Sequence, residues 1–450
     1  MNVNPKIFKA YDIRGIYPEE LDEHTGYQVG RAFATFLDPR EVIVGRDMRL
    51  SGPALAEALI EGLLEQGADV LDIGMVSTDQ YYFACATRSL PGLMVTASHN
   101  PKIYNGFKMV RKMPYLLSGD EGIQDIRRLV EIGKFPLPGR KGRLQQADVQ
   151  GEFVDKVLSL VDTGAIRPLK VVADTANGMV GPILTEIYRR LPVDLIGLYL
   201  EPDGNLPNHG LDPLQPENRR ELQQRVTAEG ADIGFAFDGD GDRFFAIDER
   251  GRFIPGDFLT AILASYLLET NPGSKILYDV RASWAVPERI KQSGGIPLME
   301  RVGHAFIKKR MALEGALFAG EVTGHYYFRD FFSADSGILP SLLLLELLSK
   351  NMSPISTLLA TLESKYFLSG EINIRADYPH RRIEALAERY REAEQHRMDG
   401  LSVIFPDWHF NVRPSNTELL LRLNLESVRS LKDMETKRDE VFAVLSASNP

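Results

Sequence analysis

The 450-residue sequence contains a single cysteine, Cys85, which excludes an internal disulfide. It also lacks an apolar run long enough to span a membrane. The longest one, GILPSLLLLELL, contains Pro340 and Glu346 and falls short of the ~20 apolar residues that a span requires. The N-terminal MNVNPKIFKAYDIRG has no apolar segment typical of a signal peptide. We therefore expect a cytoplasmic protein in which the leucine-rich segment is a buried helix.

Long basic runs are also absent. The 52 Lys and Arg are outnumbered by 62 Asp and Glu, which gives a formal net charge of −10 at pH 7, and basic runs such as Lys308 to Arg310 are short. A negative surplus repels nucleic acid and anionic membrane surfaces, so we expect neither as a partner. Any anionic ligand must be bound by individually placed cations. The composition, 44% hydrophobic and 25% charged, is otherwise that of an ordinary folded protein.

Strand and helix signals alternate over the first three quarters of the chain, as in REVIVGRD, SGPALAEALIEGLLEQ and ADVLDIGMV. The βαβ pattern recurs twice, and PLPGRKGRLQQ (136–146) is expected to be the first linker. The last part carries a strand, a charged helix over 380–397, further strands and a final helix. We expect three related α/β domains with mixed sheets and a C-terminal α+β domain, at residues 1–145, 146–248, 249–364 and 365–450.

In each α/β unit a polar loop follows a strand. TASHNP follows GLMV, DGDGD follows IGFAF, and GEVTGH follows ALFA. Open α/β sheets bind ligands outside the carboxyl ends of their strands. The three loops are therefore candidates for a ligand site.

The loop DGDGDR places Asp238, Asp240 and Asp242 at alternate positions, with glycines that let the backbone wrap around one point. Three converging carboxylates favour a hard cation, and Mg²⁺ fits best. An acidic surface turn and a calcium loop are alternatives. Glu249 stands at the twelfth position of such a calcium loop, but its sixth position, normally glycine, is Arg243.

Four other segments have both a functional and a structural interpretation. TASHNP could be a simple turn, since no nucleophile-elbow motif surrounds Ser98. RPSNTE groups donors that could hold a phosphate or merely cap a helix. GEVTGH pairs an acid with a hydroxyl, as sugar recognition needs, or is a tight turn. His304 is equally consistent with a core histidine, and Tyr11 and Arg14 near the start are weak candidates alone.

Together these segments resemble the α-D-phosphohexomutase family, and within it the bacterial phosphomannomutase/phosphoglucomutase group. The resemblance rests on AYDIRG, GRDMRLSG, TASHNPKIYNGFK, DGNLPNHGLDPLQPEN, DGDGDR, GEVTGH and RPSNTE, in this order over essentially the whole chain. It implies four domains around a central cleft, with a phosphoserine loop, a metal loop, a sugar loop and a phosphate-binding loop in successive domains.

The resemblance also implies roles for individual residues. Ser98 matches the phosphorylated serine, and Mg²⁺ would be held by its phosphate with Asp238, Asp240 and Asp242. Residues expected around the reacting phosphate are Arg14, His99, Lys108, Arg243 and His304, with Lys108, His304 and Arg14 as candidate acid or base groups. Residues expected to bind substrate are Tyr11, Arg281, Glu321, Thr323, His325, Arg413, Ser415, Asn416 and Thr417.

The implied reaction interconverts hexose 1-phosphate and hexose 6-phosphate through the phosphoserine and a bound 1,6-bisphosphate, with glucose or mannose 1,6-bisphosphate as activator. Since glucose and mannose differ only at C2, recognition through O3 and O4 predicts activity on both. Two departures put the substrate preference in question: Thr323 replaces a frequent serine, and Arg281 a common lysine. Phosphoglucosamine mutase and a non-catalytic sugar-phosphate-binding paralogue are alternatives, and monomer or homodimer stays open.

Overall fold

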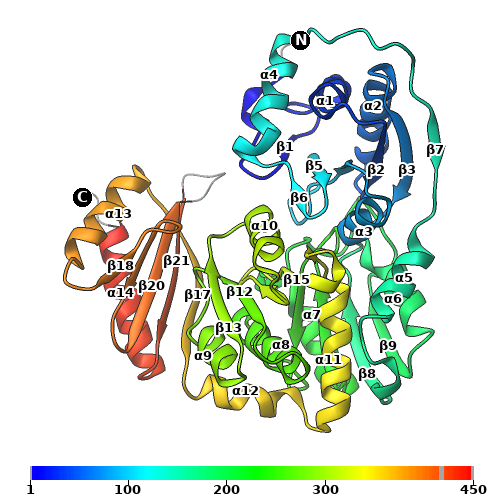
Figure 1. Cartoon of the computed structure of the whole chain (residues 1–450). Helices are drawn as coiled ribbons and strands as arrows, with labels where there is room; N and C mark the ends of the chain where they lie inside the picture. The colour runs from blue at the N-terminus through cyan, green and yellow to red at the C-terminus, as the bar shows by residue number, and fades with distance from the viewer. Residues whose placement is uncertain (1–2, 415–419, 447–450) are drawn as a thin grey trace.

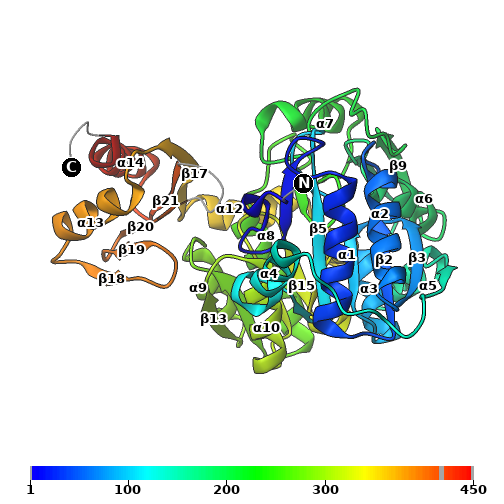
Figure 2. The same ribbon diagram turned by 90° about the horizontal axis from the view of Figure 1, so that it is seen from above.

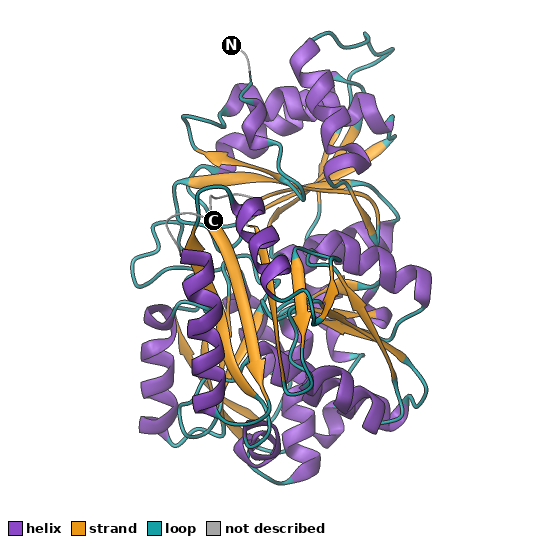
Figure 3. Cartoon of the chain, turned by 90° about the vertical axis from the view of Figure 1, so that its left-hand side faces the viewer, coloured by secondary structure: helices purple, strands orange, loops and turns teal. Residues whose placement is uncertain are grey.

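The computed structural model describes residues 3–414 and 420–446. The chain forms four sheets in sequence order, one per domain (Figure 1). Helices cover the faces of these sheets (Figure 3). The first three sheets combine parallel and antiparallel strands, and the fourth is wholly antiparallel. The predicted fold class is therefore confirmed.

The elements divide among the four sheets as follows. The first domain contains β1 (Ile13–Ile16), α1 (Glu23–Leu37), β2 (Glu41–Arg46), α2 (Gly52–Glu65), β3 (Asp69–Met75), α3 (Thr78–Arg88), β4 (Gly92–Val95), β5 (Tyr104–Lys112), β6 (Tyr115–Leu116), α4 (Gln124–Ile132) and β7 (Leu144–Gln146). The second contains α5 (Gln150–Leu158), β8 (Leu169–Asp174), α6 (Val180–Tyr188), β9 (Val193–Leu198), α7 (Pro216–Glu229), β10 (Ile233–Phe237) and β11 (Phe244–Ile247). The third contains α8 (Gly256–Thr270), β12 (Lys275–Asp279), α9 (Ala285–Gln292), β13 (Ile296–Glu300), α10 (His304–Glu314), β14 (Phe318–Gly320), β15 (Tyr326–Phe328), β16 (Ala334–Asp335), α11 (Ile338–Asn351) and α12 (Ile355–Glu363). The fourth contains β17 (Phe367–Arg375), α13 (Pro379–Arg389), β18 (Glu394–His396), β19 (Leu401–Ile404), β20 (Trp408–Pro414), β21 (Leu420–Ser427) and α14 (Leu431–Ser446).

The three α/β sheets share one strand order. Each contains a run of four strands, β3-β2-β4-β5, β9-β8-β10-β11 and β13-β12-β14-β15, in which three parallel strands are followed by an antiparallel one. The polar loops occupy the same place in each run, between the last parallel strand and its antiparallel neighbour. The shared topology explains why all three loops emerge at carboxyl ends of strands, as expected.

Two boundaries differ from the sequence interpretation. Leu144–Gln146, expected within a linker, forms the edge strand β7, which pairs with β3 in parallel. The predicted domain boundary after residue 145 thus falls inside a strand, and the four domain limits otherwise stay a proposal. The three residues of β7 are exposed, so no alternating apolar pattern marks them.

The charged helix expected over 380–397 is shorter in the structure. Helix α13 ends at Arg389, and Glu394–His396 forms β18, which pairs with β19. The Gln395 side-chain amide donates to the carbonyl oxygen of Ala387 in the last turn of the helix and to that of Tyr390 just after it. Tertiary contacts therefore end the helix at Arg389, although the composition of the residues that follow favours helix.

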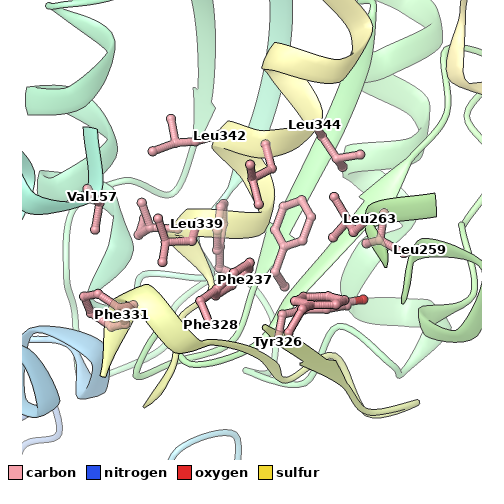
Figure 4. Packing of buried hydrophobic residues seen from close by; sticks show 14 of the residues in the cluster. Val157, Phe237, Leu259, Leu263, Tyr326, Phe328, Phe331, Leu339, Leu342 and Leu344 are labelled. Carbon is pink, nitrogen blue, oxygen red and sulfur yellow. The ribbon is translucent and has the colours of Figure 1, made fainter. Parts of the chain in front are cut away.

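The three α/β domains share one continuous apolar core, whereas the C-terminal domain has its own. Helix α11 lies inside the shared core, as expected, with leucines such as Leu342 and Leu344 facing aromatic side chains of neighbouring strands (Figure 4). The C-terminal domain lies to one side of the other three in both views (Figures 1 and 2). Among the described residues no helix is both long and apolar enough to cross a bilayer.

Candidate active site

The Ser98 loop follows β4 and is held by a buried arginine. Arg49 donates four hydrogen bonds to backbone oxygens of this loop, including those of Ser98 at 2.8 Å and Asn100 at 2.7 Å. Arg49 is paired with Asp47 at 3.2 Å. Ser98 itself has a left-handed backbone with φ of 49°, which costs a non-glycine residue about 1 kcal/mol or more. The sequence analysis did not predict this role for Asp47 and Arg49, although both lie in the GRDMRLSG segment.

The Ser98 hydroxyl faces two acceptors. Its Oγ donates to Asp238 Oδ2 at 2.8 Å and lies 3.2 Å from His99 Nδ1. Burial lowers the pKa of His99 well below its usual range, and the nearby Arg243 and Arg14 lower it further. The His99 ring is therefore neutral and can accept a proton.

The three aspartates converge as the sequence predicted. Oxygens of Asp238, Asp240 and Asp242 lie within 4.8 Å of one another, and all three side chains are buried. Lys108, from β5, pairs with Asp240 at 2.7 Å and with Asp242 at 2.5 Å. Burial, with Asp242 and Asp240 beside it, raises the pKa of Asp238 well above its usual value. Lys108 thus pairs with two of the three carboxylates, and Arg243 lies 3.9 Å from the third, Asp238.

This cluster fits a small divalent cation. Asp240 Oδ1 is buried and accepts no hydrogen bond, so it offers a lone pair without a protein partner. Carboxylate oxygens at this separation match the ligands that Mg²⁺ prefers. The calcium-loop alternative is wrong, because Glu249 lies beyond the far end of β11, where it accepts hydrogen bonds from the backbone and hydroxyl of Ser356.

The third loop joins the metal cluster through His325. Its Nε2 lies 3.5 Å from Asp242 Oδ1, and its Nδ1 lies 3.3 Å from Glu321 Oε2. Burial opposes protonation, but Asp242 and Glu321 outweigh it and raise the His325 pKa to about 9. Glu321 also accepts hydrogen bonds from the Gly303 amide at 3.0 Å and the Tyr327 hydroxyl at 2.8 Å. In this arrangement Glu321 is bound by the protein, while Thr323 lines the cleft.

His304, Tyr11 and Arg14 lie close to the loops rather than on the cavity wall. The rings of Tyr11 and His304 are in edge contact at 6.1 Å, and Arg14 donates to the Ala97 carbonyl at 3.1 Å and to Asn100 Oδ1 at 2.6 Å. Burial lowers the pKa of His304 well below its usual value, and Lys308 adds to this effect. Arg14 therefore positions the serine loop.

The C-terminal domain contributes Arg413 beside Arg281 of the third domain. Arg281 forms a two-point ion pair with Asp279 and also contacts Glu371 at 3.1 Å. Arg413 lies 3.9 Å from the same carboxylate. The remaining predicted residues of this loop lie outside the described residues: Ser415, Asn416 and Thr417.

A cavity of about 620 Å³ lies where the domains meet. Its wall includes His99 from the first domain, Arg243 from the second, Arg281 and Thr323 from the third, and Glu371 from the fourth. Cavities of this size accommodate small ligands. The predicted central cleft is therefore present, and arginines of the second, third and fourth domains line it.

Comparisons with known proteins agree with this architecture. Three family models, described as phosphoglucomutase/phosphomannomutase alpha/beta/alpha domains I, II and III, match residues 5–136, 151–251 and 255–366. The chain belongs to this family. A phosphomannomutase of Escherichia coli is 42% identical over 97% of this chain and 98% of its own length. Proteins called phosphohexose mutases in Xanthomonas campestris pv. campestris are 40% identical over 97% of this chain and 98% of theirs.

A solved structure gives the same result. A phosphoglucomutase/phosphomannomutase family protein of Burkholderia thailandensis superimposes with a TM-score of 0.89 at 34% identity, covering 98% of each chain. The resemblance inferred from the motifs is confirmed. The protein is an enzyme, a hexose phosphate mutase that moves a phosphate within a sugar phosphate.

Proposed function

We propose that the enzyme interconverts the 1- and 6-phosphates of mannose and glucose, with Ser98 as phosphoryl carrier and the bound 1,6-bisphosphate as intermediate. The observation that carries this proposal is the position of the Ser98 hydroxyl, 2.8 Å from Asp238 in a loop held by Arg49. A serine hydroxyl needs such electrostatic support to carry a phosphoryl group.

Asp238, Asp240 and Asp242 are the proposed ligands of Mg²⁺, which supplies positive charge to the phosphoryl oxygens when bound. Arg243, Lys108 and His325 surround the same position with three further cations. Phosphoryl transfer gains mainly from positioning and electrostatics, so a rigid loop next to placed cations is what the reaction requires.

The two transfers are balanced as follows. In the first, the sugar hydroxyl oxygen loses its proton and bonds to the phosphorus of phosphoserine, while the bond from Ser98 Oγ to phosphorus breaks and Oγ takes up a proton. After the bisphosphate turns over, Ser98 Oγ loses its proton and bonds to the phosphorus of the other phosphate, while the bond from that phosphorus to the sugar oxygen breaks and the sugar oxygen takes up a proton. We assign His99 Nδ1, 3.2 Å from Oγ, to orient the Ser98 hydroxyl, because burial with Arg243 and Arg14 nearby holds the pKa of His99 well below its usual range and makes it a weak base.

Substrate recognition is proposed to combine Thr323 and Glu321 at the sugar with Arg281 and Arg413 at the distant phosphate. Glu321 is held in place by Tyr327 and Gly303, which fixes the loop that Thr323 presents to the cavity. Hydrogen bonds to O3 and O4 do not distinguish the two configurations at C2, so the phosphates of both mannose and glucose should react.

A phosphorus NMR time course tests the proposal. It would use Mg²⁺, catalytic glucose 1,6-bisphosphate, and the 1-phosphates of mannose, glucose and glucosamine in parallel. Formation of the first two 6-phosphates supports it. Conversion of glucosamine 1-phosphate alone would show that the protein is a phosphoglucosamine mutase instead. If none of the three sugar phosphates is converted, the protein is a non-catalytic binding paralogue.

A further inference from the structure

Glu371 lies among three arginines at the junction of the third and fourth domains. Its Oε2 contacts Arg281 at 3.1 Å and approaches Arg413 at 3.9 Å, while its Oε1 lies 3.4 Å from Arg422. Arg281 and Arg413 are buried, and Arg422 is about one quarter exposed. Arginine forks match phosphate geometry, so this arrangement is also suited to a phosphate group.

The strand is built to bring this carboxylate into the cleft. Pairing of β17 with β21 shifts register between Leu368 and Glu371, and Gly370 there has φ of +68°. A Cβ on Gly370 would meet no atom within 4 Å, so backbone conformation rather than space explains the glycine. Bulges of this kind re-aim a side chain next to functional sites. Here the bulge places Ser369, Gly370 and Glu371 on the cavity wall.

The charges of the groups in direct contact do not balance. Within 4 Å, three guanidinium groups face two carboxylates, those of Asp279 and Glu371, which leaves one positive charge in excess, while Asp399 and Glu321 act on Arg413 and Arg281 from farther away. Among the residues that the structure describes, the buried Nε groups of Arg413 and Arg422 meet no hydrogen-bond acceptor. The cluster thus retains both charge and donors for a second, more highly charged anion.

We infer that Glu371 is an internal surrogate for the substrate's non-transferred phosphate. Its carboxylate holds the arginines of two domains in place and yields to the phosphate when substrate binds. Replacing one negative charge by the two of a phosphate would make the cluster neutral. This inference rests on the proposed function in placing the distant phosphate at Arg281 and Arg413, and it adds Arg422 and Glu371 to that site.

While the Glu371 carboxylate occupies the site, phosphate cannot bind there. The apparent affinity for phosphate therefore equals the intrinsic affinity multiplied by the fraction of time that the site is free. A carboxylate that occupies the site about 80–90% of the time reduces phosphate affinity about five- to tenfold. Glu371→Gln keeps the shape but removes the charge. We expect it to tighten binding of inorganic phosphate and glucose 6-phosphate by this factor, and to lower KM with little change in kcat.

Calorimetric titration of the full-length protein with both ligands tests the inference, alongside steady-state kinetics. Glu384→Gln is the matched control, because Glu384 pairs with Arg397 on the surface of the same domain. Glu371→Asp should return affinity toward wild type. Unchanged or weaker phosphate binding by Glu371→Gln would overturn the inference. The binding measurements do not depend on turnover, so they test the inference even if the protein is inactive. Absence of mutase activity in the wild type would refute the proposed function and not the inference.

Discussion

Substitution of Lys108 gives the sharpest test of how the negative charge of Asp238, Asp240 and Asp242 is balanced. Its ammonium group is buried between Asp240 and Asp242, and these carboxylates raise its pKa despite burial, so it is charged at working pH. Lys108→Gln leaves Asp240 without its pairing cation, while Arg243 stays beside Asp238 and His325 beside Asp242. Removing one partner of a buried ion pair costs about 3–5 kcal/mol. We therefore expect a less stable metal-free protein.

The size of the thermal shift follows from the shared core. About 360 residues unfolding together at roughly 2.1 cal/mol/K each give an entropy of about 0.76 kcal/mol/K. A loss of 3–5 kcal/mol then lowers Tm by about 4–7 °C. Mg²⁺ should reverse part of this loss, since ligand at 100 times Kd stabilises by about 2.7 kcal/mol. The rise in Tm on adding Mg²⁺ should be larger in the variant, where no lysine competes for the carboxylates.

Differential scanning calorimetry with EDTA or with saturating MgCl₂ measures both effects. Lys108→Gln/Asp240→Asn is the control, because removing a carboxylate together with the lysine relieves the imbalance. It should regain stability in EDTA and respond less to Mg²⁺. An equal Mg²⁺-induced shift in wild type and Lys108→Gln would refute the assignment of the aspartates as ligands beside this lysine.

Three further predictions concern the serine, the phosphate site and a buried acid. Ser98→Ala should reduce turnover at least about 10³-fold with an unchanged circular dichroism spectrum, and full activity would exclude the phosphoserine route. Arg413→Ala should raise KM about 10–100-fold, since hydrogen bonds to charged groups contribute about 1.5–3 kcal/mol, without reducing Ser98 phosphorylation seen by mass spectrometry. Burial raises the pKa of Asp257 to about 7, and its Oδ1 has no hydrogen-bond partner. Because the folded state holds this proton more tightly than the unfolded chain, the free energy of unfolding should fall by on the order of 4 kcal/mol as the pH rises from 4 to 7. Asp257→Asn should flatten that slope in urea melts, whereas an identical slope would contradict it.

The local patterns of the sequence predicted what depends on neighbours along the chain. Aspartates alternating with glycines favour a loop that wraps toward one point, so the pattern predicted the convergence of Asp238, Asp240 and Asp242, with an acidic surface turn as an alternative. Apolar periodicity likewise predicted the α/β units and the buried helix α11. The strand order shared by three sheets was not predicted in detail, because it depends on pairings between distant segments.

Long-range pairs account for the features that sequence reasoning missed. Arg49 reaches carbonyl oxygens about fifty residues away, and Arg281 meets Glu371 ninety residues along the chain. No spacing rule connects such residues. Glu249 shows the converse error, since it fits a calcium loop by position but is carried away from the aspartates by strand β11. A motif predicts chemistry only where the backbone between its members forms a loop.

The site's charged contacts also join the domains in sequence. Ser98 and Lys108 of the first domain bind the aspartate loop of the second. His325 of the third bridges Asp242 to Glu321.

The fourth domain is joined differently. It has a core of its own, and it meets the third through the ion pair of Arg281 with Glu371 and through the stacked rings of Trp284 and His409, while only its margin, at Leu368 and Val428, packs against the common core. Apolar packing does not respond to a ligand's charge, but an ion pair does, because an incoming anion competes for the same guanidinium group. The junction that contains this ion pair is thus the one where substrate phosphate is proposed to bind. Binding there would exchange an interdomain contact for a ligand contact, which makes the position of the fourth domain depend on whether substrate is present.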